Sequence, residues 1–118
     1  MRCLIVDDDP IAQAILEGYV DQHDDLEHVG TVGLASEGGA FMNRQDVDLV
    51  LLDVELGTES GFDLARRAAW WTQIIFVTGK PEYAASSYDY RAADYLLKPI
   101  GYRRFQEAID RARRLNKA

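Results

Sequence analysis

Four apolar stretches of this 118-residue chain each end at side chains that could take part in chemistry. These side chains are the carboxylates of Asp7, Asp8 and Asp53, the hydroxyl of Thr78 and the ammonium of Lys98. Short apolar runs are typical of buried strands, and ligands bind where the carboxyl ends of neighbouring parallel strands meet. We therefore expect the five side chains to converge on one small site, with Asp53 at its centre.

Three carboxylates at one site repel one another, and this raises the pKa of at least one of them unless a cation is present. Oxygen ligands of this kind suit Mg²⁺, which binds through one or two carboxylates together with waters and phosphate oxygens. The sequence thus predicts a Mg²⁺ site. The alternative is that the acids only cap helices and turns, as Asp9 before Pro10 is expected to do.

The same group of side chains suits phosphoryl transfer. Lys98 supplies a fixed positive charge and Thr78 a hydroxyl donor, and with Mg²⁺ they could neutralise the oxygens of a phosphoryl group. Asp53 would then be the nucleophile and would form an aspartyl phosphate. A carboxylate that is ionised at neutral pH needs no general base, and we expect His23 and His28 at the surface.

The elements that must position these residues alternate along the chain. The expected strands are 2–6, 27–33, 48–53, 73–77 and 93–97, and the expected helices are 10–23, 34–44, 60–71, 82–91 and one that begins at Gly101 or Tyr102. Near-continuous apolar strands need cover on both faces. With right-handed crossovers, five strand–helix repeats give an α/β fold with a doubly wound, five-stranded parallel sheet. Strand 27–33 contains two glycines and suits an edge.

Length and composition indicate one globular domain over residues 1–118. Hydrophobic residues make up 47% and charged residues 28%, which is typical of a folded chain. The lone Cys3 lies in an apolar run, where a buried, inert thiol is expected. With no disulfide partner, no signal peptide and no run of about 20 apolar residues, we expect a cytoplasmic protein without membrane contact.

The net charge of −7 is uneven along the chain. Residues 101–118 carry +4, so residues 1–100 carry −11. An acidic body disfavours direct contact with nucleic acid. The basic last helix is expected to be a solvated face or a surface for a protein partner.

Over its full length the chain resembles the receiver domain of two-component response regulators. The matching signature is Asp7-Asp8, Asp53, Gly61, Thr78-Gly79 and Lys98-Pro99. The segments 82–84 and 94–99 most resemble receivers of LytTR-type regulators. The resemblance implies a flavodoxin- or CheY-like (βα)5 fold. It also implies no direct nucleic-acid contact by residues 1–118; such a contact could be made through a LytTR output domain, and whether one follows residue 118 stays open.

The resemblance implies a role for each residue of the site. Asp53 would accept phosphate from a sensor histidine kinase, and Lys98 and Thr78 would hold the phosphoryl oxygens. Mg²⁺ would be bound by Asp53, by Asp8 directly, by Asp7 through a water and by the backbone carbonyl of Glu55. The bond between Lys98 and Pro99 would be cis.

A switch is also implied, in which Tyr95 changes rotamer as Thr78 moves towards the phosphoryl group. This would alter the face made by helix 82–91, strand 93–97 and the last helix, and a homodimer could form there. We expect Tyr88 in the core and Tyr90 at the surface of this face. Of Trp70 and Trp71, at the far end of the sheet, one is expected in the core, and an exposed one would indicate a second contact surface.

Two departures from the family pattern lie near Asp53. Gly57 stands where proline is common, which predicts a looser loop. Glu55 and Lys80 flank the mouth of the site, and we hypothesise that they pair and hinder the water that attacks the acyl phosphate. The alternative is two separate solvated side chains.

Two other functions compete with the switch, which would not be an enzyme beyond its own phosphorylation and dephosphorylation. One is a dehalogenase-like phosphatase, but that class has a second aspartate where Glu55 stands here. The other is a receiver-like interaction module that is never phosphorylated, and the full set of site residues argues against it.

Overall fold

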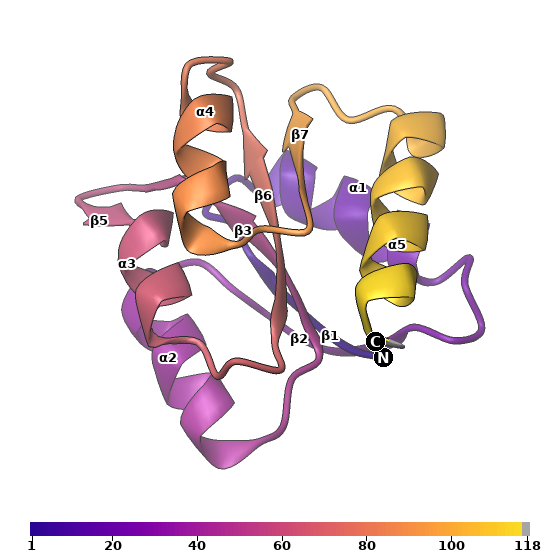
Figure 1. Cartoon of the computed structure of the whole chain (residues 1–118), viewed down its shortest axis with the longest axis horizontal. Coiled ribbons are helices and arrows are strands. Elements are labelled where there is room, and N and C mark those ends of the chain that lie inside the picture. The colour runs from indigo at the N-terminus through magenta and orange to yellow at the C-terminus, as the bar shows by residue number, and fades with distance from the viewer. Residues whose placement is uncertain (117–118) are drawn as a thin grey trace.

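The computed structural model describes residues 1–116. The main sheet has five parallel strands in the order β2-β1-β3-β6-β7, and a small antiparallel hairpin, β4–β5, follows β3 (Figure 1). The strands are β1 (Arg2–Val6), β2 (Glu27–Val32), β3 (Leu49–Asp53), β4 (Glu55–Leu56), β5 (Glu59–Ser60), β6 (Gln73–Thr78) and β7 (Asp94–Leu97). The helices are α1 (Pro10–Val20), α2 (Ala35–Arg44), α3 (Gly61–Arg67), α4 (Tyr83–Ser87), the 3₁₀ turn η1 (Tyr88–Tyr90) and α5 (Tyr102–Asn116).

Helices cover both faces of the sheet, as the apolar strands require. Alternate residues of each central strand enter different cores, because successive side chains of a strand point to opposite faces. Cys3 and Ile5 of β1 pack with α1 and α5, whereas Leu4 and Val6 pack with the side of α2 and α3. Figure 1 shows α1 and α5 on one side and α2, α3 and α4 on the other. The predicted doubly wound α/β fold is confirmed.

Local sequence signals fix several boundaries. The Asp9 side chain caps α1 by accepting a hydrogen bond from the amide of Ile11, and Pro10 occupies the first helical turn. Ser60, which as a serine at the start of the expected helix 60–71 is a favoured capping residue, caps α3 in the same way. The bond between Lys98 and Pro99 is cis. These predicted features are confirmed, as are the edge position of β2 and the burial of Cys3.

Three predictions about helix ends are wrong. α1 ends at Val20, and α3 ends at Arg67, before the two tryptophans. The segment predicted as one helix over 82–91 is a short α4 followed by η1, which ends at Arg91 in the left-handed region with φ 55°.

Consequently, aromatic residues in these segments lie differently from expectation. Trp70 and Trp71 both lie in the loop after α3 and are both exposed, Trp70 by 89%, so neither belongs to the core. Tyr88 is 77% exposed, because the 3₁₀ turn directs it away from the sheet. Tyr90 turns inward instead and stacks on Phe62 with ring centroids 4.7 Å apart.

The basic last helix, α5, packs on the sheet through an apolar stripe. Phe105, Ala108, Ile109 and Ala112 are buried, whereas Leu115 in the last turn is exposed. None of the helices within residues 1–116 is long and apolar enough to cross a membrane.

Candidate functional site

Three carboxylates gather at the carboxyl ends of β1 and β3. Val6 of β1 lies opposite Leu52 of β3, so the next residue of each segment, Asp7 and Asp53, emerges side by side with the other. One oxygen from each of Asp7, Asp8 and Asp53 lies within 4.8 Å of the others. Asp7 is fully buried and Asp53 is 6% exposed, whereas Asp8 is open to solvent. The acid cluster therefore has a buried floor and one exposed member at its entrance.

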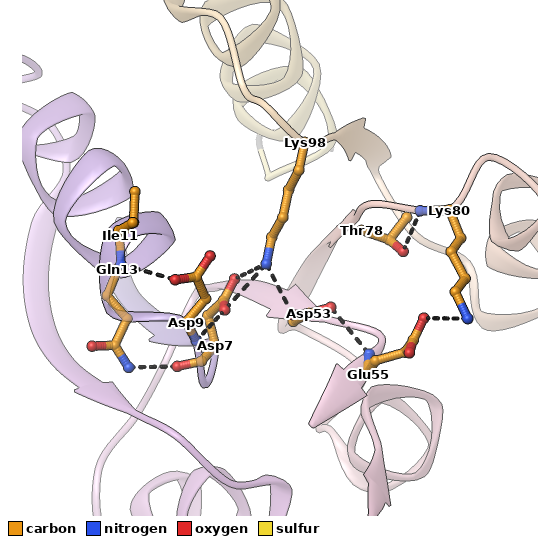
Figure 2. Close-up of polar contacts among 9 residues, drawn as sticks. All are labelled: Asp7, Asp9, Ile11, Gln13, Asp53, Glu55, Thr78, Lys80 and Lys98. Atoms are coloured by element: carbon orange, nitrogen blue, oxygen red, sulfur yellow. Dashed lines mark hydrogen bonds and ion pairs between the residues drawn. The ribbon is translucent and has the colours of Figure 1, made fainter. Parts of the chain in front are cut away.

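Lys98 reaches this cluster from the end of β7, two strands away in the sheet (Figure 2). Its Nζ donates hydrogen bonds to Oδ2 of Asp53 at 3.0 Å and to Oδ1 of Asp7 at 3.2 Å. The same nitrogen lies 3.0 Å from Oδ2 of Asp7. One ammonium thus partly offsets the charge of two buried carboxylates.

Burial is the main cause of the unusual pKa of Asp53, which is raised to about 6. Hydrogen bonds from the Glu55 amide and from Lys98 act in the opposite direction, and the charge of Asp7 adds a smaller upward contribution. The predicted rise in pKa within the acid cluster is confirmed, although desolvation outweighs the repulsion from which it was inferred. Burial lowers the pKa of Lys98, but its hydrogen bonds to Asp7 and Asp53 outweigh this and raise it overall.

Thr78 stands at the end of β6, next to β3 in the sheet. It is buried, and its Oγ1 accepts a hydrogen bond from the Lys80 amide at 3.1 Å. Asp53 pairs with Val77 in the register, so the hydroxyl is carried by the next residue along the adjoining strand. Thr78 is therefore next to the acid cluster, but its hydroxyl oxygen accepts a hydrogen bond from the loop after β6.

Glu55 and Lys80 form an ion pair at the mouth of the site, with Lys80 Nζ 3.2 Å from Glu55 Oε1 (Figure 2). This contact confirms the predicted pairing. The backbone amide of Glu55 also donates to Oδ1 of Asp53 at 3.0 Å. Glu55 thus contacts Asp53 through its backbone amide and Lys80 through its side chain.

Two glycines shape the loop after Asp53. Gly57 has φ 65°, in the left-handed region, where proline cannot go because its ring holds φ near −65°. The segment forms the β4–β5 hairpin around this residue. A Cβ atom on Gly61 would lie 2.1 Å from the backbone oxygen of Asp53, so only glycine allows α3 to begin this close to the acid.

The oxygen atoms of the cluster fit a divalent cation. Oδ2 of Asp7 is buried and has no hydrogen-bond partner within residues 1–116, although Lys98 Nζ lies near it. Burying a carboxylate oxygen without a hydrogen bond costs folding free energy unless a bound cation or an ordered water interacts with that oxygen. The ligands are all hard oxygens, which suits Mg²⁺ better than a softer metal.

The switch residue inferred for this family, Tyr95, is half-buried on β7 opposite Phe76. A cavity of about 240 Å³ adjoins it, lined also by Leu97, Pro99 and Arg104. Its neighbour Asp94 is buried and accepts two hydrogen bonds from Arg104 at 2.7 and 2.8 Å. Arg104 also donates to the carbonyl of Tyr95, so α5 is tied to the strand that carries the switch residue.

Two features beside the site were not found from the sequence. Gln13 donates a side-chain hydrogen bond to the carbonyl of Asp7, and no spacing rule indicates such a contact. Ile11 lies at helical spacing from Ile15 on α1, which favours an apolar face, but it is 72% exposed. With Ile15 and Pro99 it lines a mainly apolar cavity of about 260 Å³ that reaches Lys98.

Known proteins share both the sequence and the fold. Residues 3–110 match the response regulator receiver domain. The sensory transduction protein LytT of Enterococcus faecalis is 35% identical over 95% of this chain, and the transcriptional regulatory protein BtsR of Escherichia coli K12 is 32% identical over 96%. The chain spans 48% of the length of each of these relatives.

Among solved structures, the response regulatory domain of mrkE from Klebsiella pneumoniae superposes with a TM-score of 0.90. It is 27% identical, and the match covers 99% of this chain and 98% of that one. The chain belongs to the response regulator receiver domain family and is thus a receiver domain of a two-component response regulator. The LytT match confirms the predicted similarity to LytTR-type receivers.

Proposed function

We propose that this domain is a phosphorylation switch in which Asp53 accepts a phosphoryl group from the phosphohistidine of a sensor kinase in the cytoplasm. The observation that carries the proposal is the contact of Lys98 Nζ with Oδ2 of Asp53 at 3.0 Å, inside a cluster of three acids. With a pKa of about 6, Asp53 is largely ionised at pH 7 and is a competent nucleophile without a base.

In the transfer, a carboxylate oxygen of Asp53 forms a bond to phosphorus while the phosphorus–nitrogen bond of the phosphohistidine breaks. The electron pair of that bond stays on the imidazole nitrogen, which takes up a proton from solvent. Lys98 moves from the carboxylate to the phosphoryl oxygens and offsets their charge. Thr78 can donate its hydroxyl proton to another of these oxygens, because Oγ1 now only accepts from Lys80.

The carboxylates of Asp7, Asp8 and Asp53 and the carbonyl of Glu55 would hold Mg²⁺, which neutralises phosphoryl oxygens when it is bound. The support is Oδ2 of Asp7, which is buried and takes part in no hydrogen bond within residues 1–116, and the hard-oxygen character of the cluster. Asp8 is the exposed member and would be the first ligand that an entering ion meets.

The apolar cavity lined by Ile11, Ile15 and Pro99 is the proposed docking place for the kinase partner. It opens beside Lys98, so an apolar helix seated there would present its phosphohistidine to Asp53. We expect Ile11→Ser to slow transfer from a kinase and to leave labelling by acetyl phosphate unchanged. Slowing of both reactions would remove this docking place from the proposal.

The output would follow from movement of Thr78 and Tyr95, which biases the face of α4, β7 and α5 between two arrangements. A phosphoryl group adds charge and acceptor oxygens at the site, and an inward swing of Tyr95 would change the surface beside α5. We propose that a second receiver binds this face after phosphorylation and that any DNA contact is left to a LytTR output domain.

Incubation with acetyl phosphate and Mg²⁺, followed by intact mass measurement, tests the proposed function. A single phosphoryl adduct that is absent from Asp53→Asn and from samples with chelator supports the switch. Rapid turnover of added phosphoesters would indicate a phosphatase instead. No reaction in the folded protein would indicate an interaction module that takes no phosphate.

A further inference from the structure

The backbone carbonyl of Asp7 lies just beyond the sheet. β1 ends at Val6, and the Asp7 amide still donates to the carbonyl of Val32 on β2 at 3.0 Å. The Asp7 carbonyl instead accepts a short hydrogen bond from Nε2 of Gln13, on the second turn of α1 (Figure 2). A side chain thus fixes the peptide group that joins Asp7 to Asp8.

This contact closes a ring of hydrogen bonds between the acid loop and the helix. The Asp9 amide donates to Oδ1 of Asp7 at 2.9 Å, and the Gln13 amide donates to the carbonyl of Asp9 at 2.9 Å. The Asp9 side chain caps the helix through Ile11. Because the Gln13 side chain donates to the Asp7 carbonyl, Asp7 is held through both its side chain and its backbone (Figure 2).

The peptide plane between Asp7 and Asp8 is rigid, so its orientation decides where both side chains leave the backbone. Without the Gln13 donor, the Asp7 carbonyl is free to turn towards water, and the two carboxylates move with it. Mg²⁺ demands near-ideal octahedral geometry and is sensitive to such movement.

We propose that Gln13 is a positioning residue that holds Asp7 and Asp8 in the arrangement that binds the divalent cation. This inference rests on the proposed function of the site. It assigns no contact with the ion to Gln13, which acts only through the Asp7 carbonyl. Removal of groups that orient metal ligands typically weakens metal affinity about 10- to 100-fold, and we expect the low end here because Asp9 still holds Oδ1 of Asp7.

Gln13→Met tests the proposal because it keeps an unbranched side chain of similar length and removes the donor. Gln106→Met, on the exposed side of α5, is the matched control. Mg²⁺ affinity is measured from the NMR shifts of the backbone amides of residues 8 and 53, and the unfolding free energy is measured in urea without Mg²⁺.

We expect Gln13→Met to raise the Kd for Mg²⁺ about tenfold. Gln106→Met should bind as the unaltered protein does. The Mg²⁺ concentration that half-saturates labelling by acetyl phosphate should rise by the same factor, while the rate at saturating Mg²⁺ stays unchanged. This split between affinity and maximal rate separates positioning from a direct role in the transfer.

An unchanged Kd in Gln13→Met, with or without a loss of stability, would overturn the proposal and leave Gln13 a structural residue. If that variant does not fold, Gln13→Ala takes its place with the same two outcomes. Failure of the unaltered protein to bind Mg²⁺ or to form an adduct would instead overturn the proposed function. The Gln13 variants therefore test the positioning role, and the unaltered protein tests the proposed function.

Discussion

Lys98 Nζ lies 3.0 Å from Oδ2 of Asp53, although 45 residues separate the two in the sequence. The contact spans β7 and β3, which are separated by β6, and it also includes Asp7 from β1. Three strand ends are thus connected by one ammonium. The arrangement gives Asp53 a charged partner in a buried site, and several consequences can be measured.

Lys98→Met removes the only side-chain cation that the structure, over residues 1–116, places on Asp53. We expect labelling of Asp53 by acetyl phosphate to slow about 100-fold, because a lost donor to a developing anion typically costs this much. The measurement is the initial rate of adduct formation by mass spectrometry. Arg103→Met, at an exposed position of α5, is the control and should label normally; equal rates in both variants would show that Lys98 plays no part.

The Glu55–Lys80 ion pair is expected to prolong the life of the phosphoryl group. Both side chains are about half exposed, so the double variant Glu55→Ala, Lys80→Ala should fold and unfold much as the unaltered protein does. Loss of the pair opens the mouth of the site to the attacking water, and phosphate should be lost faster. The measurement is the decay of the adduct after acetyl phosphate is removed. An unchanged half-life rejects the gate.

Asp94 contributes to stability in a pH-dependent way. Burial alone raises the pKa of its carboxyl, but hydrogen bonds from Arg104 outweigh this and lower it overall. Because the pKa of Asp94 is lower in the folded state than its ordinary value of 3.8, its charge stabilises the fold at pH values above 3.8. This stabilisation is lost as the pH falls through the pKa of the folded state. Because Arg104 is partly exposed, we expect Asp94→Asn to cost only about 1–2 kcal/mol at pH 7.

The difference between Asp94→Asn and the unaltered protein should persist at pH 5 and shrink below pH 3.8. Urea unfolding at a series of pH values measures it. A difference that is constant down to the acid range would mean that the charge of Asp94 contributes nothing.

Gly57 and Gly18 make a matched pair for backbone strain. A Cβ atom would meet nothing within 4 Å at either position, but only Gly57 has a positive φ. We expect Gly57→Ala to destabilise the domain by about 1–2 kcal/mol, the usual cost of a left-handed residue with a side chain. Gly18→Ala, inside α1, should stabilise it by about 0.5–1 kcal/mol. Chemical unfolding that gave both changes the same sign would contradict the assigned backbone at Gly57.

The central strands and the acid cluster were predictable from the sequence. Apolar runs mark the strands, and the acids stand where these runs end. β1, β3 and β6 are buried on both faces, whereas the edge strand β7 is only partly covered; each carries an apolar run that polar groups follow. Parallel pairing then places those groups at one edge. The predicted strand arrangement was therefore sufficient to place Lys98 near Asp53.

Other features depend on what covers a residue, and the sequence does not carry this information. Ile11 fits the helical repeat of α1 but lies in the first turn, where it is left mostly uncovered beside Pro99. Trp70 and Trp71 are large aromatic residues of the kind that often pack in a core. However, α3 ends before them, and they lie in an exposed loop. Tyr88 is exposed and Tyr90 is partly buried, because a 3₁₀ turn, with three residues per turn, rotates them relative to an α-helix.

Asp53 is the acceptor on which the proposed phosphorylation switch depends. Borohydride reduction converts an aspartyl phosphate to homoserine, and fragmentation of the resulting peptides shows which residue carried the phosphoryl group. After treatment with acetyl phosphate and Mg²⁺, homoserine is expected at position 53 and at no other acid of the cluster. Homoserine at position 7 or 8, or none in a folded sample, would contradict the assignment.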